Sequence, residues 1–105
     1  MMDAVTAVSG SGPAYFFYLI EAMVQAGVAE GLPADVATQL AVATCAGSAK
    51  LLSETGVSPQ KLRAQVTSPN GTTQAAIETM DAASVKSALV KAIRAAATRS
   101  RELGK

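Results

Sequence analysis

The chain has 105 residues, which is the length of a single domain. Half of its residues are apolar, 16% are charged, and nine basic residues stand against eight acidic ones. The apolar content excludes a disordered chain, and the charge balance argues against a nucleic-acid binder, which would carry a basic excess. With no histidine and one cysteine, Cys/His zinc sites, Ser-His-Asp triads and disulfide frameworks are excluded, and we predict no metal site.

The ends and the apolar runs of the chain bear on its location. The first residues lack a basic segment followed by an apolar core, so we expect no secretory signal. The most apolar run, residues 13–28, is interrupted by Glu21 and Gln25, which favours a buried helix over a membrane span. The single Cys45 fits a reducing compartment, and we expect a cytoplasmic protein that binds no membrane.

The composition predicts an all-α fold, a bundle of about five helices. Alanine, the best helix former, occupies 22 positions, and β-branched residues never form alternating runs. Ser11, Gly12 and Pro13 predict the start of a first helix that extends through Val28. Because apolar residues cover most of its circumference, this helix must be enclosed by other helices, in part by those of a second chain.

Gly31, Leu32 and Pro33 are predicted to end the first helix and to start the second. The second helix contains a run of small side chains at residues 41–49, which predicts a close crossing with a neighbouring helix. Cys45 lies in this run and is interpreted as a buried, inert thiol. Gly56 is the predicted stop.

A short third helix is predicted from residue 60 to about residue 65. Ser58 and Pro59 open it, and we expect Leu62 and Val66 to point inward. A polar loop at residues 66–73 then leads into a fourth helix, which continues through residue 80.

A last helix is predicted after Ser84, which we expect to cap it. Its basic residues are expected to face water or a partner. The residues of its inner stripe are Val85, Leu89, Ala92, Ile93, Ala96 and Leu103.

The loop at residues 66–73 has the chemistry of an anion site. The first amides of a helix lack partners within the helix, and the helix dipole places partial positive charge there. Gly71 allows close approach and unusual dihedral angles, and the hydroxyls of Thr72 and Thr73 can donate to a carboxylate. The alternative interpretation is simple capping, because Ser, Thr and Asn are common before any helix.

The glycine-rich segment at residues 9–13 is only superficially similar to a phosphate loop, since it lacks a lysine and a preceding strand. We expect a tight turn into the first helix there. Tyr15 and Tyr18 are interpreted as residues at the edge of the core, and Glu21 as part of the exposed stripe.

Two segments of the chain resemble one known family. Residues 7–15 have the sequence Ala-Val-Ser-Gly-Ser-Gly-Pro-Ala-Tyr, and residues 66–73 have the sequence Val-Thr-Ser-Pro-Asn-Gly-Thr-Thr, followed by an Ala-Ile pair. Together with the ending Arg-Ser-Arg-Glu-Leu at residues 99–103, they are similar in order and spacing to pyrroline-5-carboxylate reductase. The similarity covers nearly the whole chain.

The resemblance implies that residues 1–105 are the C-terminal helical dimerisation domain of such an enzyme. Family members carry an N-terminal Rossmann domain, and nothing in this sequence corresponds to its dinucleotide motif. We therefore expect a truncated or proteolysed chain, with Met1 and Met2 as an added or altered start. The family reduces the imine of 1-pyrroline-5-carboxylate to proline with NADPH or NADH, and this domain alone is expected to bind no coenzyme. The resemblance also implies an interlocked homodimer, which in many members assembles into larger rings.

The resemblance assigns roles to single residues of the loop. The backbone amides of Gly71 and Thr72 would bind the substrate carboxylate. Thr73, the candidate catalytic residue, would place its hydroxyl near the carboxylate and the ring nitrogen. Val66 and Ser68 would lie along the wall of the substrate pocket.

One loop residue departs from the family pattern. Asn70 stands where many members have glycine, and the change is mild because asparagine tolerates left-handed backbone geometry. Asn70 is kept among the substrate-binding residues, whereas residues 9–13 are expected to pack at the mouth of the site.

Two other functions are weighed against this one. The chain could act only as a helical oligomerisation module without catalytic activity. It could also be the helical domain of another dehydrogenase, but other families would need a catalytic lysine or histidine set that the sequence does not contain.

Overall fold

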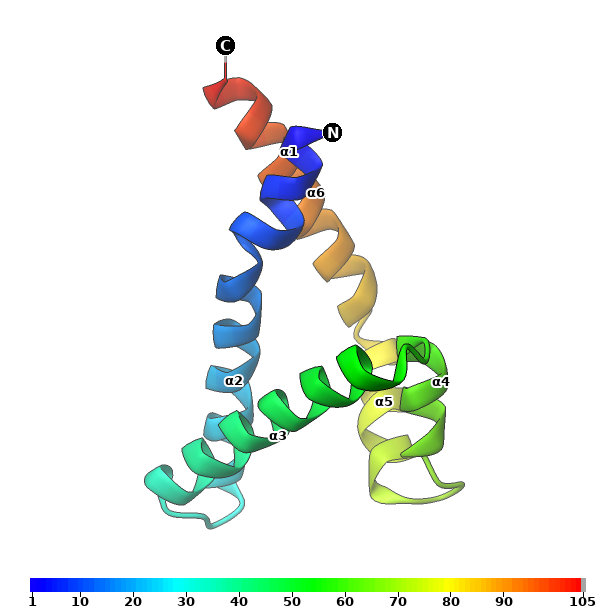
Figure 1. The fold of residues 1–105 in the computed structure, drawn as a ribbon. Coiled ribbons are helices and arrows are strands. Elements are labelled where there is room, and N and C mark those ends of the chain that lie inside the picture. Colours follow the sequence, from blue (N-terminus) through cyan, green and yellow to red (C-terminus); the bar gives the residue numbers. More distant parts are fainter. Residues whose placement is uncertain (105) are drawn as a thin grey trace. The chain divides into compact units, whose positions relative to one another are not determined.

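The structure is a computed structural model, and it describes residues 1–104. The described residues contain helices and no strand, which confirms the predicted all-α class. The elements are α1 (Met2–Val5), the π-helix η1 (Thr6–Gly10), α2 (Gly12–Ala29), α3 (Ala34–Thr55), α4 (Pro59–Gln65), α5 (Thr72–Ala82) and α6 (Val85–Leu103) (Figure 1). The chain divides into two compact units: the first comprises residues 1–13 and the residues from 63 onward, and the second comprises residues 14–62. None of the helices in residues 1–104 combines the length and the apolar content needed to cross a membrane.

The first unit is built on α6, against which α1, η1 and α5 pack. Figure 1 shows the start of the chain, α1, beside α6. Ala7 is only 1% exposed at this contact. Ser100 Oγ donates a hydrogen bond of 2.7 Å to Asp3 Oδ1, which joins two residues 97 positions apart in the sequence.

The predicted inner stripe of α6 is confirmed only in its middle. Ile93 and Ala96 are half-buried, and so is Ala97, which lies on the same face. The other members of the predicted stripe, Val85, Leu89, Ala92 and Leu103, are exposed. Burial of apolar residues on α6 is therefore limited to its middle, and the apolar residues toward both of its ends stay exposed to solvent.

The segment before α2 differs from the expected tight turn. Residues 2–10 are helical, and the Ser11 N–H donates to Thr6 O at 2.8 Å, the i to i+5 bond of a π-helix. Ser9 Oγ donates to Val5 O at 2.8 Å. A helix before residue 11 was not predicted, and its packing on α6 is a long-range contact that the local sequence does not reveal.

The second unit contains α2 and α3, joined by the turn at residues 30–33. Gly27 lies against the start of α3: a Cβ atom added to Gly27 would be 3.1 Å from Ala37 Cβ. Ala37 and Ala41 are each 4% exposed. A close crossing through small side chains is therefore present, but it lies at the start of α3 rather than along the predicted run. Of residues 41–49 only Ala41 is buried, and nothing lies within 4 Å of a Cβ atom added to Gly47.

Beyond the crossing, α2 and α3 diverge (Figure 1) and leave an apolar groove of about 300 Å³ between them. The groove is lined by Phe16, Leu19, Ile20, Met23, Thr44, Cys45, Ser48, Ala49 and Leu52.

The predicted helix boundaries are largely confirmed. Gly56 has a φ of +64° and donates its N–H to Leu52 O at 3.2 Å, which ends α3. Ser58 Oγ accepts the N–H of Lys61 at 3.2 Å, which starts α4. Ser84 does precede α6, but its side chain makes no cap, because the residue adopts left-handed geometry with a φ of +56°.

The expectation that Val66 points inward is wrong for this chain, although Leu62 is half-buried. Val66 is 64% exposed, because α4 ends at Gln65 and the next residue enters the loop.

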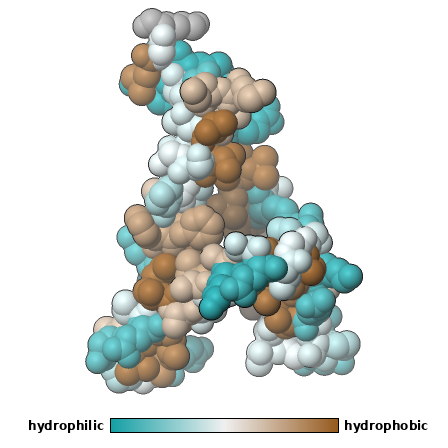
Figure 2. Space-filling model, in the orientation of Figure 1, coloured by the Kyte–Doolittle hydropathy of each residue, from teal (hydrophilic) through white to brown (hydrophobic). Residues whose placement is uncertain are grey.

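Little apolar surface is buried within residues 1–104. The buried hydrophobic residues there are three alanines, Ala7, Ala37 and Ala41. By contrast, Phe17 is 64% exposed and Tyr18 is 75% exposed. Figure 2 shows apolar side chains lying on the outside of the helices. Within residues 1–104, most large apolar side chains of α2 stay exposed, so the other helices of this chain provide little of the enclosure that was predicted.

Candidate functional site

The loop before α5 is shaped by a tight turn. The Gly71 N–H donates to Ser68 O at 3.0 Å, with Pro69 and Asn70 between them. Asn70 has a φ of +61°. A turn with proline at its second position and a positive-φ residue at its third position has the pattern of a type II turn. The prediction that asparagine supports left-handed geometry here is confirmed.

At Gly71, space rather than the dihedral angles disfavours a side chain. Its φ of −89° and ψ of −178° are ordinary extended values. A Cβ atom on this residue would lie 3.2 Å from Ser68 O. The observed close approach at Gly71 is one by the loop's own backbone, and the approach of an anion there stays a prediction.

Sequence reasoning missed the side chain of Gln74. Its Oε1 atom accepts the backbone N–H of Asn70 and closes the loop from the side of the helix. A glutamine at the third position of a helix commonly reaches back to the residue that precedes the helix. The spacing of Gln74 from Gly71 could have predicted this contact, whereas the hydroxyl residues alone were used to predict the loop.

The start of α5 has unused donors. Within residues 1–104, the backbone N–H groups of Thr72, Thr73 and Gln74 have no acceptor. No side chain caps the helix, so the simple capping alternative does not describe this N-terminus. Three free amides at the positive end of a helix dipole form a site suited to a carboxylate.

The predicted site residues are neighbours in the sequence, and they differ in exposure. Gly71 and Thr73 are half-buried, whereas the remaining predicted residues are exposed: Val66, Ser68, Asn70 and Thr72. The Thr73 hydroxyl makes no hydrogen bond within the described residues. The neighbouring Thr67 differs, because its hydroxyl is held by Arg63 O.

The other residues singled out in the sequence lie elsewhere. Tyr18 and Glu21 are exposed on α2, and Tyr15 is half-buried. Cys45 is a free, half-buried thiol in the groove between α2 and α3. Among residues 1–104, no group of three or more Cys, Asp or Glu side chains is placed to hold a metal ion.

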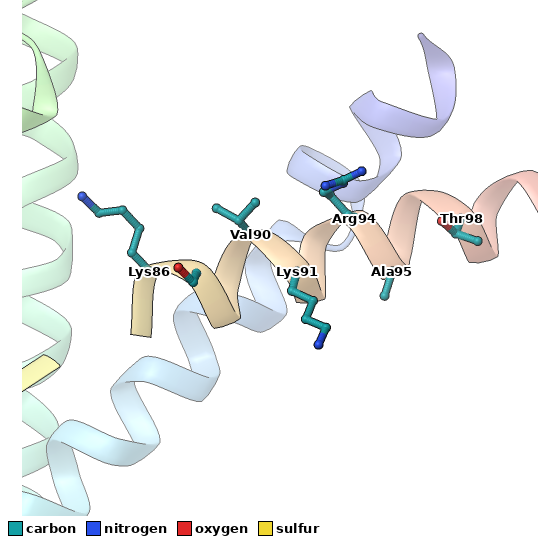
Figure 3. A pocket seen from close by; sticks show the side chains of 7 residues that line it. Lys86, Val90, Lys91, Arg94, Ala95 and Thr98 are labelled. Carbon is teal, nitrogen blue, oxygen red and sulfur yellow. The ribbon is translucent and has the colours of Figure 1, made fainter. Parts of the chain in front are cut away.

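The basic side chains of α6 form a second polar surface, shown in Figure 3. They lie along a shallow hollow of about 560 Å³ on one helix. Lys86, Lys91 and Arg94 are exposed there, as the sequence predicted. In the described part of the chain, none of the three has an acidic partner, since the ion pairs join Lys50 to Glu54 and Arg99 to Glu102.

The fold and the loop define a class: an all-helical module with incomplete burial of its apolar residues and a helix N-terminus open to an anion. Residues 1–103 match the family model described as pyrroline-5-carboxylate reductase dimerisation. The chain belongs to this family.

Two similar proteins are named pyrroline-5-carboxylate reductase. The chain is 51% identical over 104 residues to pyrroline-5-carboxylate reductase of Corynebacterium melassecola, covering 99% of this chain and 38% of that protein. It is 50% identical over 103 residues to the enzyme of Arabidopsis thaliana, covering 98% of this chain and 37% of that protein. The chain therefore spans less than half the length of these relatives.

Two solved structures agree with the fold. The NADP-bound pyrroline carboxylate reductase of Plasmodium falciparum matches with a TM-score of 0.94 and 33% identity, over 99% of this chain and 42% of that one. The pyrroline-5-carboxylate reductase of Coxiella burnetii matches with a TM-score of 0.93 and 40% identity, over 98% and 38% of the two chains.

Proposed function

We propose that this chain is the substrate-binding and dimerisation domain of a reductase that converts 1-pyrroline-5-carboxylate to L-proline, with NADPH or NADH as the reductant. The observation that carries the proposal is the set of free amides at the start of α5, in a chain that belongs to the family. The reaction completes proline biosynthesis, and we place it in the cytoplasm.

The substrate carboxylate binds at the N-terminus of α5. Charge-assisted hydrogen bonds to the amides of Thr72 and Thr73 hold it, and the helix dipole adds to the attraction. Gly71 contributes by its lack of a side chain, because its own N–H is already donated to Ser68 O.

Thr73 places its hydroxyl near the carboxylate and the ring nitrogen, where it can donate to either. Val66, Ser68 and Asn70 line the pocket beside it. The exposure of Val66 supports this role, because an apolar side chain at 64% exposure is available to cover the substrate ring.

The coenzyme is not held by these residues. A dinucleotide site needs a glycine-rich turn between a strand and a helix, and residues 9–13 instead lie where a π-helix leads into α2. We assign the coenzyme to a Rossmann domain outside residues 1–105, from which it supplies the hydride. The role of the present residues is to bind and orient the substrate.

The partner is a second copy of the chain. Interlocking of two copies in a homodimer covers the apolar side chains that one copy leaves open, and such dimers can assemble further. A stand-alone oligomerisation module without activity is the second candidate, and the same exposed side chains favour it.

The test uses the complete natural protein that contains these residues. We expect oxidation of NADPH on addition of 1-pyrroline-5-carboxylate, with competitive inhibition by L-proline and far weaker inhibition by L-prolinamide, which lacks the carboxylate. Absence of oxidation would leave the oligomerisation module as the function. Equal inhibition by proline and prolinamide would remove the carboxylate from the proposed site.

A further inference from the structure

The side chain of Gln74 controls how the loop enters α5. Gln74 is the third residue of that helix, is half-buried, and accepts the N–H of Asn70 through its Oε1 atom. In the usual arrangement, such a side chain accepts the N–H of the N-cap residue. Here the N-cap is Gly71, whose N–H is already donated to Ser68 O, so the contact has moved back by one residue.

The backbone N–H groups of residues 70–74 fall into two groups. The amides of Asn70 and Gly71 are both consumed inside the loop, whereas the amides of residues 72–74 are left free. The bond from Gln74 also engages the N–H of Asn70, whose φ of +61° is a left-handed geometry that asparagine tolerates. Without this hydrogen bond, the loop keeps only the bond from Gly71 to Ser68, and the orientation of its amides is less well fixed.

We infer that Gln74 is a positioning residue for the substrate carboxylate: it fixes the loop so that the free amides of Thr72 and Thr73 at the start of α5 are directed at the anion. The inference rests on the proposed function, since it assumes that the carboxylate binds there. Gln74 acts through Asn70 and does not itself need to touch the substrate through its side chain.

The first experiment replaces the acceptor without changing the size of the side chain. In the complete natural protein, Gln74→Met should raise the KM for 1-pyrroline-5-carboxylate about three- to tenfold, the loss expected for one loop hydrogen bond. The kcat and the KM for NADPH should change less than about twofold. The matched control is Gln60→Met, on the exposed face of α4, which should leave all three constants unchanged.

The second variant, Gln74→Glu, retains an acceptor for the Asn70 N–H but adds a negative charge close to the carboxylate site. It should raise the same KM at low ionic strength, and added salt should restore the KM toward that of the unaltered protein, because salt screens exposed charges. The increase caused by Gln74→Met should persist in salt, since it arises from lost geometry.

The outcomes are distinct. Absence of turnover by the unaltered protein overturns the proposed function and this inference with it. Normal turnover combined with an unchanged KM in Gln74→Met, even if the melting temperature falls, overturns the positioning role alone. If Gln74→Met does not fold, Gln74→Glu decides: a KM that is unchanged at low salt places residue 74 away from the carboxylate and overturns the inference.

Discussion

Phe16 offers a direct test of whether a second copy covers the apolar groove of α2 and α3. Its side chain lines the groove and is 57% exposed in the single chain. A phenylalanine side chain buries about 150–250 Å² when fully covered, so the exposed part corresponds to roughly 85–140 Å². At about 25 cal/mol per Å², covering it contributes about 2–3.5 kcal/mol in each copy.

Phe16→Ala should therefore weaken a symmetric dimer by at least about 4 kcal/mol, because the change occurs in both copies. This loss raises the dimer Kd roughly 10³-fold. Sedimentation equilibrium on the complete natural protein, over a wide range of concentration, measures the Kd. The control is Gln25→Ala, which alters an exposed polar residue of the same helix and should leave the Kd unchanged. A monomeric unaltered protein at micromolar concentration, or an unchanged Kd in Phe16→Ala, would refute the reasoning.

Three further predictions test the site and the first unit. Thr73→Ala should raise the KM and lower kcat/KM for 1-pyrroline-5-carboxylate more than Thr67→Ala does, because the hydroxyl of Thr67 already donates to the backbone. Equal small effects of the two substitutions in steady-state assays would remove Thr73 from the site. Asn70→Val should lower the free energy of unfolding by about 1–2 kcal/mol, because a β-branched residue resists positive φ, while Asn70→Gly should be nearly neutral in the same denaturant titration. Ser100→Ala and Asp3→Ala should each cost about 1 kcal/mol, and a double-mutant cycle should give a coupling near that value if the bond between them persists in solution.

The helix boundaries were predictable where backbone chemistry decides them locally. Proline at residue 33 cannot continue a helix, and glycine at residue 56 takes a left-handed conformation at little cost. The π-helix at residues 6–10 could not be predicted in this way, since no local signal marks its i to i+5 bond and its contact with α6 joins distant parts of the sequence. Ser84 shows the opposite error: a residue of the right type stands before α6, but its backbone conformation keeps its hydroxyl from the helix.

The candidate loop was predictable as a segment but not in its internal bonding. Its hydroxyl residues and Gly71 marked the start of a helix, and the structure places that start at Thr72. Which amides are free depends on which acceptors the folded loop provides. The turn at Ser68 takes the Gly71 N–H, and Gln74 takes that of Asn70, so the free donors begin one residue later than the sequence suggested.

The residues buried within a single copy also explain why folding and assembly should be linked. The helices make their closest contacts through alanine and glycine, whose burial contributes little because each removes at most one methyl group from water. The large apolar side chains, Phe17 and Tyr18 among them, lie outside these contacts. A chain of this kind gains most of its apolar burial only when another surface covers it. The melting temperature of the dimer should therefore rise with protein concentration, because dilution favours the unfolded chains by mass action. Calorimetry at concentrations that differ a hundredfold measures this, and a constant melting temperature would show that one copy is stable without its partner.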